Sequence, residues 1–226
     1  MQRPGRWAPV ALLVAALGYA TWLLSYVLPV KVGTLNGYVS ELPAKGQPFR
    51  WVFGSGDLVA GALVAVVAIA LWLTGRGRND KAGTVAWVAL AVFGVFTVAD
   101  VLFPLDCAPS VSAACRAAEH AGTVSVVHRI HAGTSVVTNL AVLVHMVVVA
   151  VTERRTPGRW SVLGRFAVPL AAVNVGATLA VVILVLVGSG VGIPQRLSVL
   201  CVSAWLALLA LTLARGLRPA ARRRLR

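Results

Sequence analysis

The sequence predicts an all-α, polytopic integral membrane protein, a bundle of six transmembrane helices with both the N and the C terminus in the cytoplasm. Its 226 residues are 58% hydrophobic and only 12% charged, and their mean hydropathy is +0.84. That composition is too apolar for a soluble globular protein. The chain also divides into six apolar runs, each near the length of about 20 residues that a helix needs to cross a bilayer.

The six spans follow one another along a single membrane domain, residues 7–215. The first run, 7–30, is longer than the apolar core of a signal peptide, so we expect an uncleaved first helix. The other spans are expected at about 51–74, 84–103, 124–151, 163–188 and 196–214. A short basic N-terminus, 1–6, precedes this domain and a basic tail, 216–226, follows it.

Basic residues indicate the orientation of the bundle. A net charge of +14 would suggest nucleic acid for a soluble chain, but these residues lie in short loops between spans. We therefore expect membrane lipids as partners and no nucleic acid. The positive-inside rule assigns one side to the cytoplasm, and we place the protein in a bacterial inner (plasma) membrane. Fifteen of the 21 Lys and Arg fall on that side: Arg3, Arg6, Arg76, Arg78, Lys81, Arg154, Arg155, Arg159, Arg165, Arg215, Arg218, Arg222, Arg223, Arg224 and Arg226.

Acidic residues and histidines gather toward the opposite, outer side. All four histidines lie between Glu119 and His145, and His128 and His131 fall about 60° apart on one helix face. His120, three turns before His131, has nearly the same angle as His131. The sequence therefore predicts one helix with a histidine edge. Five of the seven acids belong to the outer half: Glu41, Asp57, Asp100, Asp106 and Glu119.

Four of these residues fall at a similar depth. Asp57, Asp100, His128 and His131 lie roughly 5–10 Å below the outer boundary, counted at about 1.5 Å per residue. They come from three spans, and ionisable groups within a bilayer usually face the interior of the bundle. We therefore predict an outer-leaflet polar pocket in which these four are the candidate catalytic and metal-binding residues. We expect it to be surrounded by Ser40, Glu41, His120 and Arg129.

The donor set suggests metal chemistry. Two histidines three residues apart can approach one ion, and a carboxylate from another helix can complete the site with an open position for water. Such ligands suit zinc. In an enzyme, the metal-activated water would attack a lipid amide or ester, with an aspartate as general base. Haem is not expected, because all the histidines lie on one segment, and neither is a nucleotide.

Simpler interpretations stay open. The two aspartates can be solvated at helix ends or can pair with Arg50 or Arg129. The polar cluster can also shape a headgroup slot in a non-enzymatic module that binds lipid or stabilises a membrane-protein partner or a second copy of the chain. A small proton-coupled transporter is a third class, although carriers usually keep their site near the midplane, where this chain has only Asn139 and Asn174.

Polar residues deeper in the fourth and fifth spans are expected to be structural. Asn139 and Asn174 come out at nearly equal depth, so we expect them to hydrogen-bond each other. His145 lies about 21 Å deeper than His131 along the same helix, too far to share its site. We expect it to be a lone interhelical histidine.

Two cysteines lie in the outer loop 104–123. Cys107 and Cys115 would face an oxidising compartment, which favours a disulfide over free thiols. Such a bond would hold the stretch from Asp106 to His120 near the predicted pocket.

Several short motifs resemble a known family: Tyr38-Val39-Ser40-Glu41-Leu42, the Gly54-to-Gly61 opening of the second span, Phe103-Pro104-Leu105-Asp106-Cys107, and His120 with His131. Together they are similar to the prokaryotic membrane family catalogued as domain of unknown function 998, over roughly residues 7–215. That resemblance implies a six-helix bundle and no established chemistry.

Two other resemblances are fainter. The Ser-Glu loop and the six-span layout are similar to the Frag1/DRAM/Sfk1 group of lipid-linked membrane proteins. Alkaline ceramidases and adiponectin-type receptors, which are metal-dependent membrane amide hydrolases, use a histidine pair on their last helices. The fifth and sixth spans of this chain contain no histidine, and this departure argues against the hydrolase interpretation.

Overall fold

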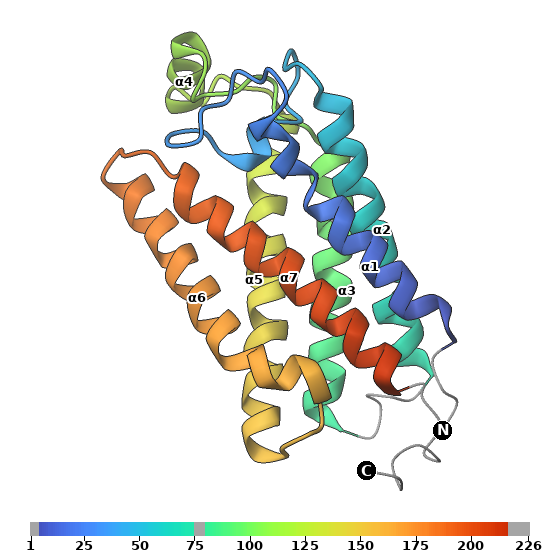
Figure 1. The fold of residues 1–226 in the computed structure, drawn as a ribbon. Coiled ribbons are helices and arrows are strands. Elements are labelled where there is room, and N and C mark those ends of the chain that lie inside the picture. The colour runs from blue at the N-terminus through green and yellow to red at the C-terminus, as the bar shows by residue number, and fades with distance from the viewer. Residues whose placement is uncertain (1–4, 75–79, 217–226) are drawn as a thin grey trace, which may run out of the picture.

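The computed structural model describes residues 5–74 and 80–216, and every regular element in them is a helix (Figure 1). Six helices are long and apolar enough to cross a membrane, so the predicted fold class is confirmed. They are α1 (Trp7–Tyr19) with its 3₁₀ continuation η1 (Thr21–Tyr26), α2 (Arg50–Leu73), α3 (Lys81–Leu102), α5 (Val126–Arg155), α6 (Ser161–Leu186) and α7 (Gly192–Gly216). The connections contain η2 (Val39–Glu41) and α4 (Ala113–His120).

The outer segment expected as a loop at 104–123 contains a helix, α4. Ser112 begins α4 by accepting a hydrogen bond at Oγ from the Cys115 amide, 3.2 Å away. Ser125 caps α5 in the same way through the His128 amide. The expected histidine edge was therefore wrong for His120, which ends α4 and does not belong to the helix of His128 and His131.

Some predictions fall outside the described residues. Residues 1–4 and 217–226 hold most of the predicted basic N-terminus and tail, and residues 75–79 hold Arg76 and Arg78. Within the described chain, α1 begins and α7 ends at the end of the bundle opposite α4 (Figure 1). We call the end with α4 the disulfide end and the other the basic end.

The six spans form a closed ring in the order α1, α2, α3, α5, α6 and α7, and α7 packs back against α1. Glycines let neighbouring backbones approach closely. A Cβ added at Gly61 of α2 would lie 2.7 Å from the Gly94 carbonyl oxygen of α3, and one added at Gly94 would lie 2.5 Å from the Ala65 amide nitrogen. Small residues at such crossings are typical of membrane helices, which associate through close packing. The seam between α5 and α6 is the loosest in the ring.

Aromatic side chains fill the ring toward the basic end. His145 is fully buried there, with Nδ1 2.8 Å from the Ala86 carbonyl oxygen of α3. Its ring lies against those of Trp87, Trp160 and Trp205, at centroid distances of 5.8–6.3 Å. These contacts join α3, α5, α7 and the residue that precedes α6, and they give His145 an interhelical packing role.

The predicted hydrogen bond between Asn139 and Asn174 was wrong. Asn139 donates instead to Thr178 Oγ1 at 3.2 Å, one turn farther along α6. Asn174 is fully buried and accepts from Ser198 Oγ of α7 at 2.6 Å. Asn174 Nδ2 also donates to Met146 Sδ of α5 at 3.4 Å. Equal depth did not bring the two amides together, because Asn174 meets α5 at Met146, two turns along the helix from Asn139.

Residues 27–49, which link η1 to α2 and which we call the first connection, are hydrogen-bonded to the start of α7 at the disulfide end. Arg196 is 4% exposed, and its Nη1 donates to the carbonyl oxygens of Thr34, Gly37 and Gly192 at 2.9, 2.9 and 3.1 Å. Gln195 Oε1 accepts from the Val39 amide at 2.6 Å. These contacts hold residues 33–41 over the open end of the ring.

Candidate functional site

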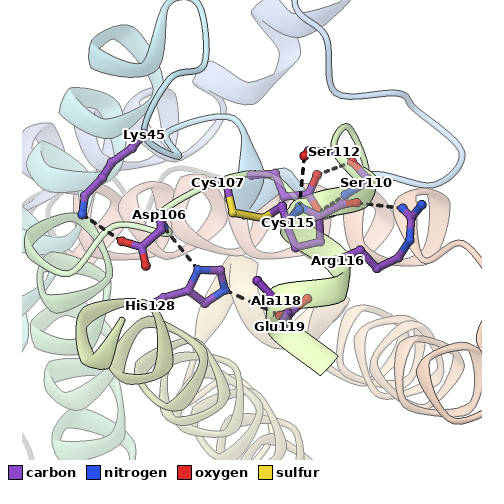
Figure 2. Close-up of a disulfide and its surroundings, with 12 residues drawn as sticks. Lys45, Asp106, Cys107, Ser110, Ser112, Cys115, Arg116, Ala118, Glu119 and His128 are labelled. Atoms are coloured by element: carbon purple, nitrogen blue, oxygen red, sulfur yellow. Dashed lines mark hydrogen bonds and ion pairs between the residues drawn. A yellow bond between two sulfur atoms is a disulfide. The ribbon is translucent and has the colours of Figure 1, made fainter. Parts of the chain in front are cut away.

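The disulfide predicted between Cys107 and Cys115 is confirmed, with Cα atoms 6.0 Å apart (Figure 2). It closes residues 107–115 into a turn that leads into α4, and we call this segment the disulfide turn. Just before it, Asp106 accepts from Lys45 Nζ and from the Ser125 amide, both at 2.9 Å. Asp106 therefore ties the first connection, the disulfide turn and the start of α5 together.

His128, in the first turn of α5, contacts the start of the same turn (Figure 2). Its Nδ1 accepts a hydrogen bond from the Asp106 amide at 3.2 Å, so this nitrogen carries no proton. Its Nε2 lies 3.6 Å from Glu119 Oε1 of α4. His128 is buried between the loop and α4, and its Nε2 approaches Glu119 without a hydrogen bond to any described residue.

Glu41 is a fully buried carboxylate in η2. It accepts hydrogen bonds from both the amide and the hydroxyl of Ser110, beside the disulfide. Burial raises the pKa of the Glu41 carboxyl above its ordinary value, and the hydrogen bonds from Ser110 oppose that shift. The Ser-Glu stretch thus joins the first connection to the disulfide turn.

A cavity of about 550 Å³ lies beneath these connections, within the ring. Its size falls in the range of small-molecule sites, about 300–1,000 Å³. Every span contributes to its wall, together with η2 and α4. Its polar lining residues are Tyr19, Tyr38, Ser40, Glu41, Asp57, Thr97, Asp100, Glu119, His131, Ser135, Thr138, Asn139, Thr178, Gln195 and Ser198.

Two predicted aspartates line this cavity from neighbouring helices. Asp100 of α3 accepts from the Thr134 hydroxyl and, at 3.5 Å, from Thr138 Oγ1, both on α5. Asp57 of α2 has no hydrogen bond or ion pair with any part of the chain that the structure describes. Asp57 is therefore a carboxyl group with free acceptor capacity inside the bundle.

His131 also lines the cavity, and its two ring nitrogens differ. Nδ1 lies 3.0 Å from the carbonyl oxygens of both Asp100 and Phe103. Carbonyl oxygens only accept, so Nδ1 carries the proton. Nε2 is buried and has no partner among residues 5–74 and 80–216. A buried polar atom without a partner typically costs about 1–3 kcal/mol, which a suitable ligand would recover.

The structure brings three of the four predicted site residues together. Asp57, Asp100 and His131 line one cavity, whereas His128 is engaged by Asp106 and Glu119 and is not part of its wall. The residues expected around the pocket divide in the same way. Ser40 and Glu41 line it, while His120 and Arg129 are exposed. Arg50 and Arg129 form no ion pair with either aspartate within the described chain.

Zinc at this site stays a prediction. His131 Nδ1 and Asp100 Oδ1 are 4.0 Å apart. Over the described ranges, no three His, Cys, Asp or Glu side chains are grouped so that they could hold a metal ion. His128 and His131 use their Nδ1 atoms for different backbone groups and lie against different neighbours. The geometry offers a cavity with carboxylates, and the metal content of the purified protein tests the prediction.

Part of the cavity wall was not predicted from the sequence. Ser135 and Thr138 lie four and seven residues after His131, on the same face of α5, and this spacing was a usable signal. Tyr19 and Gln195 carried no such signal, because ring closure alone brings α1 and α7 to the cavity.

Six apolar spans in a ring, around a cavity whose wall includes ionisable side chains, define a multi-pass helical membrane protein. The chain belongs to the family described as Protein of unknown function (DUF998), whose model matches residues 10–212. The family resemblance seen in the sequence motifs is thus confirmed over nearly the whole chain. No curated protein and no solved structure matches this chain.

Proposed function

We propose that this protein binds a membrane lipid in the cavity, with the headgroup beside Asp57, Asp100 and His131 and an acyl chain at the seam between α5 and α6. The observation that carries this proposal is the continuity of the cavity wall. The same cavity has ionisable side chains at the disulfide end and an apolar flank on the bundle surface.

The apolar flank lies where a lipid chain would enter. Val136 and Leu140 of α5 line the cavity and are 59% and 54% exposed. Val182 and Leu186 of α6 also line it and are 50% and 80% exposed. In a bilayer these surfaces face hydrocarbon, so an acyl chain can lie along them while its headgroup reaches the polar end.

We also propose that this cavity opens to the outer leaflet of a bacterial inner membrane. The basic residues that the structure describes support this orientation. Arg154 and Arg155 end α5, Arg215 lies in the last turn of α7, and Lys81 begins α3, all at the basic end. Cytoplasmic loops carry such an excess of Lys and Arg. The disulfide end then faces an oxidising compartment, where the bond between Cys107 and Cys115 is stable.

The test blocks the apolar flank. Trp at position 182 would fill the seam, so we expect Val182→Trp to lower the lipid that copurifies per chain by about tenfold or more, equivalent to ~1.4 kcal/mol. Lipid mass spectrometry after detergent exchange measures this quantity. Ile183→Trp is the matched control, because Ile183 is the next residue of α6, is 58% exposed and does not line the cavity. Equal lipid content in both variants and wild type would contradict the proposal.

A further inference from the structure

We infer that the headgroup bound here donates hydrogen bonds and carries no net negative charge, as in a lipid that ends in an amine or in several hydroxyls. This inference rests on the proposed lipid-binding function and specifies its ligand. It follows from the charges, the free acceptors and the engaged cations around the polar end of the cavity.

Carboxylates dominate the charge of the wall. Glu41, Asp57, Asp100 and Glu119 all line the cavity, and His131 is the only ionisable nitrogen base among its described lining residues. No Lys or Arg belongs to the wall as the structure describes it. Phosphate sites in proteins usually use Arg or Lys, often in bidentate contacts. An anionic headgroup would meet like charges here without such partners.

Three cations at the disulfide end are engaged by other groups. Arg196 is held by backbone carbonyl oxygens of the first connection and of α7. Lys45 pairs with Asp106 at 2.9 Å, and Arg116 Nη1 donates to the Pro109 carbonyl oxygen at 2.8 Å. Recruiting any of them to a headgroup would break contacts that hold the first connection and the disulfide turn over the end of the ring.

Among the ionisable side chains of the wall, the unmet capacity is for accepting hydrogen bonds. Asp57 has no partner among the described residues, and His131 Nε2 is buried without one. Because the His131 proton is held at Nδ1 by two carbonyl oxygens, the neutral ring presents a lone pair at Nε2. The hydroxyls of Thr134 and Thr138 already serve Asp100. Ammonium or hydroxyl groups of a ligand would satisfy the remaining acceptors.

The experiment compares three lipid probes with identical acyl chains. Lysyl-phosphatidylglycerol is net cationic, diglucosyl-diacylglycerol is a neutral polyol, and phosphatidylglycerol is anionic. The full chain is delipidated in detergent and offered an equimolar mixture, and the bound lipid is read by native mass spectrometry. We expect wild type to retain the cationic or the neutral probe at least about tenfold over the anionic one, a difference of ordinary size for a charge-selective site.

Variants separate the two donor chemistries. Asp57→Asn removes the charge with little change in shape, so an amine ligand predicts a large loss of the cationic probe, whereas a polyol ligand predicts a small change for the neutral probe. Ser55→Ala is the matched control, because Ser55 is exposed on the same helix and does not line the cavity. It should leave the order of the probes unchanged.

Failure of this inference differs from failure of the proposed function. Retention of phosphatidylglycerol equal to or above the other probes, with Val182→Trp still lowering it, would overturn the headgroup assignment and keep lipid binding. Retention of none of the probes by wild type, with no effect of Val182→Trp, would overturn both.

Discussion

At the scale of single residues, Asp106 is the acid that joins three segments at the disulfide end. It accepts from the Ser125 amide and from Lys45, and its own amide donates to His128. Hydrogen bonds from Ser125 and Lys45 lower the pKa of Asp106 to about 2. Asp106 lies between α3 and α4, outside the spans. Its contacts hold the first connection, the disulfide turn and the start of α5 together above the cavity.

This pKa predicts an acid-sensitive contribution to stability. A carboxyl group whose pKa is lower in the folded than in the unfolded chain stabilises the fold above its unfolded pKa, and the contribution disappears as the pH falls through the folded pKa. We expect Asp106→Asn to lower the melting temperature at neutral pH. The difference from wild type should close as the pH falls from about 4 to about 2. Tryptophan fluorescence during heating in detergent measures it. A difference that stays constant over this range would contradict the assignment.

At this scale, the sequence predicted the residues whose position depends on a single span or a single turn. The disulfide pair, Asp57, Asp100 and His131 were identified from depth and composition, and the structure places these last three in one wall. His128 looked equivalent to His131 because both share a helix face. The contacts of His128 with Asp106 and Glu119 depend on how the loop and α4 fold back, and no helical angle contains that information.

At the scale of elements, the contact between α2 and α3 depends on glycine. Gly61 and Gly94 face each other, and no side chain separates the two backbones. This close approach brings Asp57 and Asp100, one on each helix, to the same cavity. The geometry of the site therefore depends on a packing contact in the middle of the bundle.

Adding one methyl group tests this contact. A Cβ at position 94 would lie 2.5 Å from the Ala65 amide nitrogen, so the two helices would have to separate. We expect Gly94→Ala to destabilise the fold by about 1–3 kcal/mol, as overpacked cores do. Gly133→Ala is the control, because a Cβ at Gly133 of α5 meets nothing within 4 Å. It should be neutral or stabilising by up to about 1 kcal/mol. Unfolding in sodium dodecyl sulfate compares them, and equal tolerance would contradict the close-packing account.

At the scale of the whole molecule, ring closure decides what the cavity contains. Helices distant in sequence, α1 and α7, complete the wall that α2, α3 and α5 begin. The cap of residues 33–41 and the disulfide turn then covers the polar end, held by Arg196, Glu41 and Asp106. The exposed flank at α5 and α6 is what remains open toward lipid.

The zinc hypothesis is tested at this scale, because an ion would have to join several helices. It predicts about one Zn²⁺ per purified chain, as in a mononuclear site, and its loss in both His131→Ala and Asp57→Ala. Plasma mass spectrometry measures the metal content. Arg129→Ala is the control, since Arg129 is exposed and forms no described ion pair. Metal-free wild type with a full complement of lipid would contradict zinc and leave the lipid-binding proposal intact.

The sequence by itself determined the number of spans, the family and the residues most expensive to bury in a bilayer. These are properties of single intervals of chain, since hydropathy and charge act on each helix wherever its neighbours lie. Only the tertiary structure decided three features: that α4 forms part of the cap, that Asn139 and Asn174 hydrogen-bond to different partners, and that His131 but not His128 lines the cavity. Each of these outcomes depends on which helix faces are in contact, and contact is set by the mutual packing of six helices and two connections.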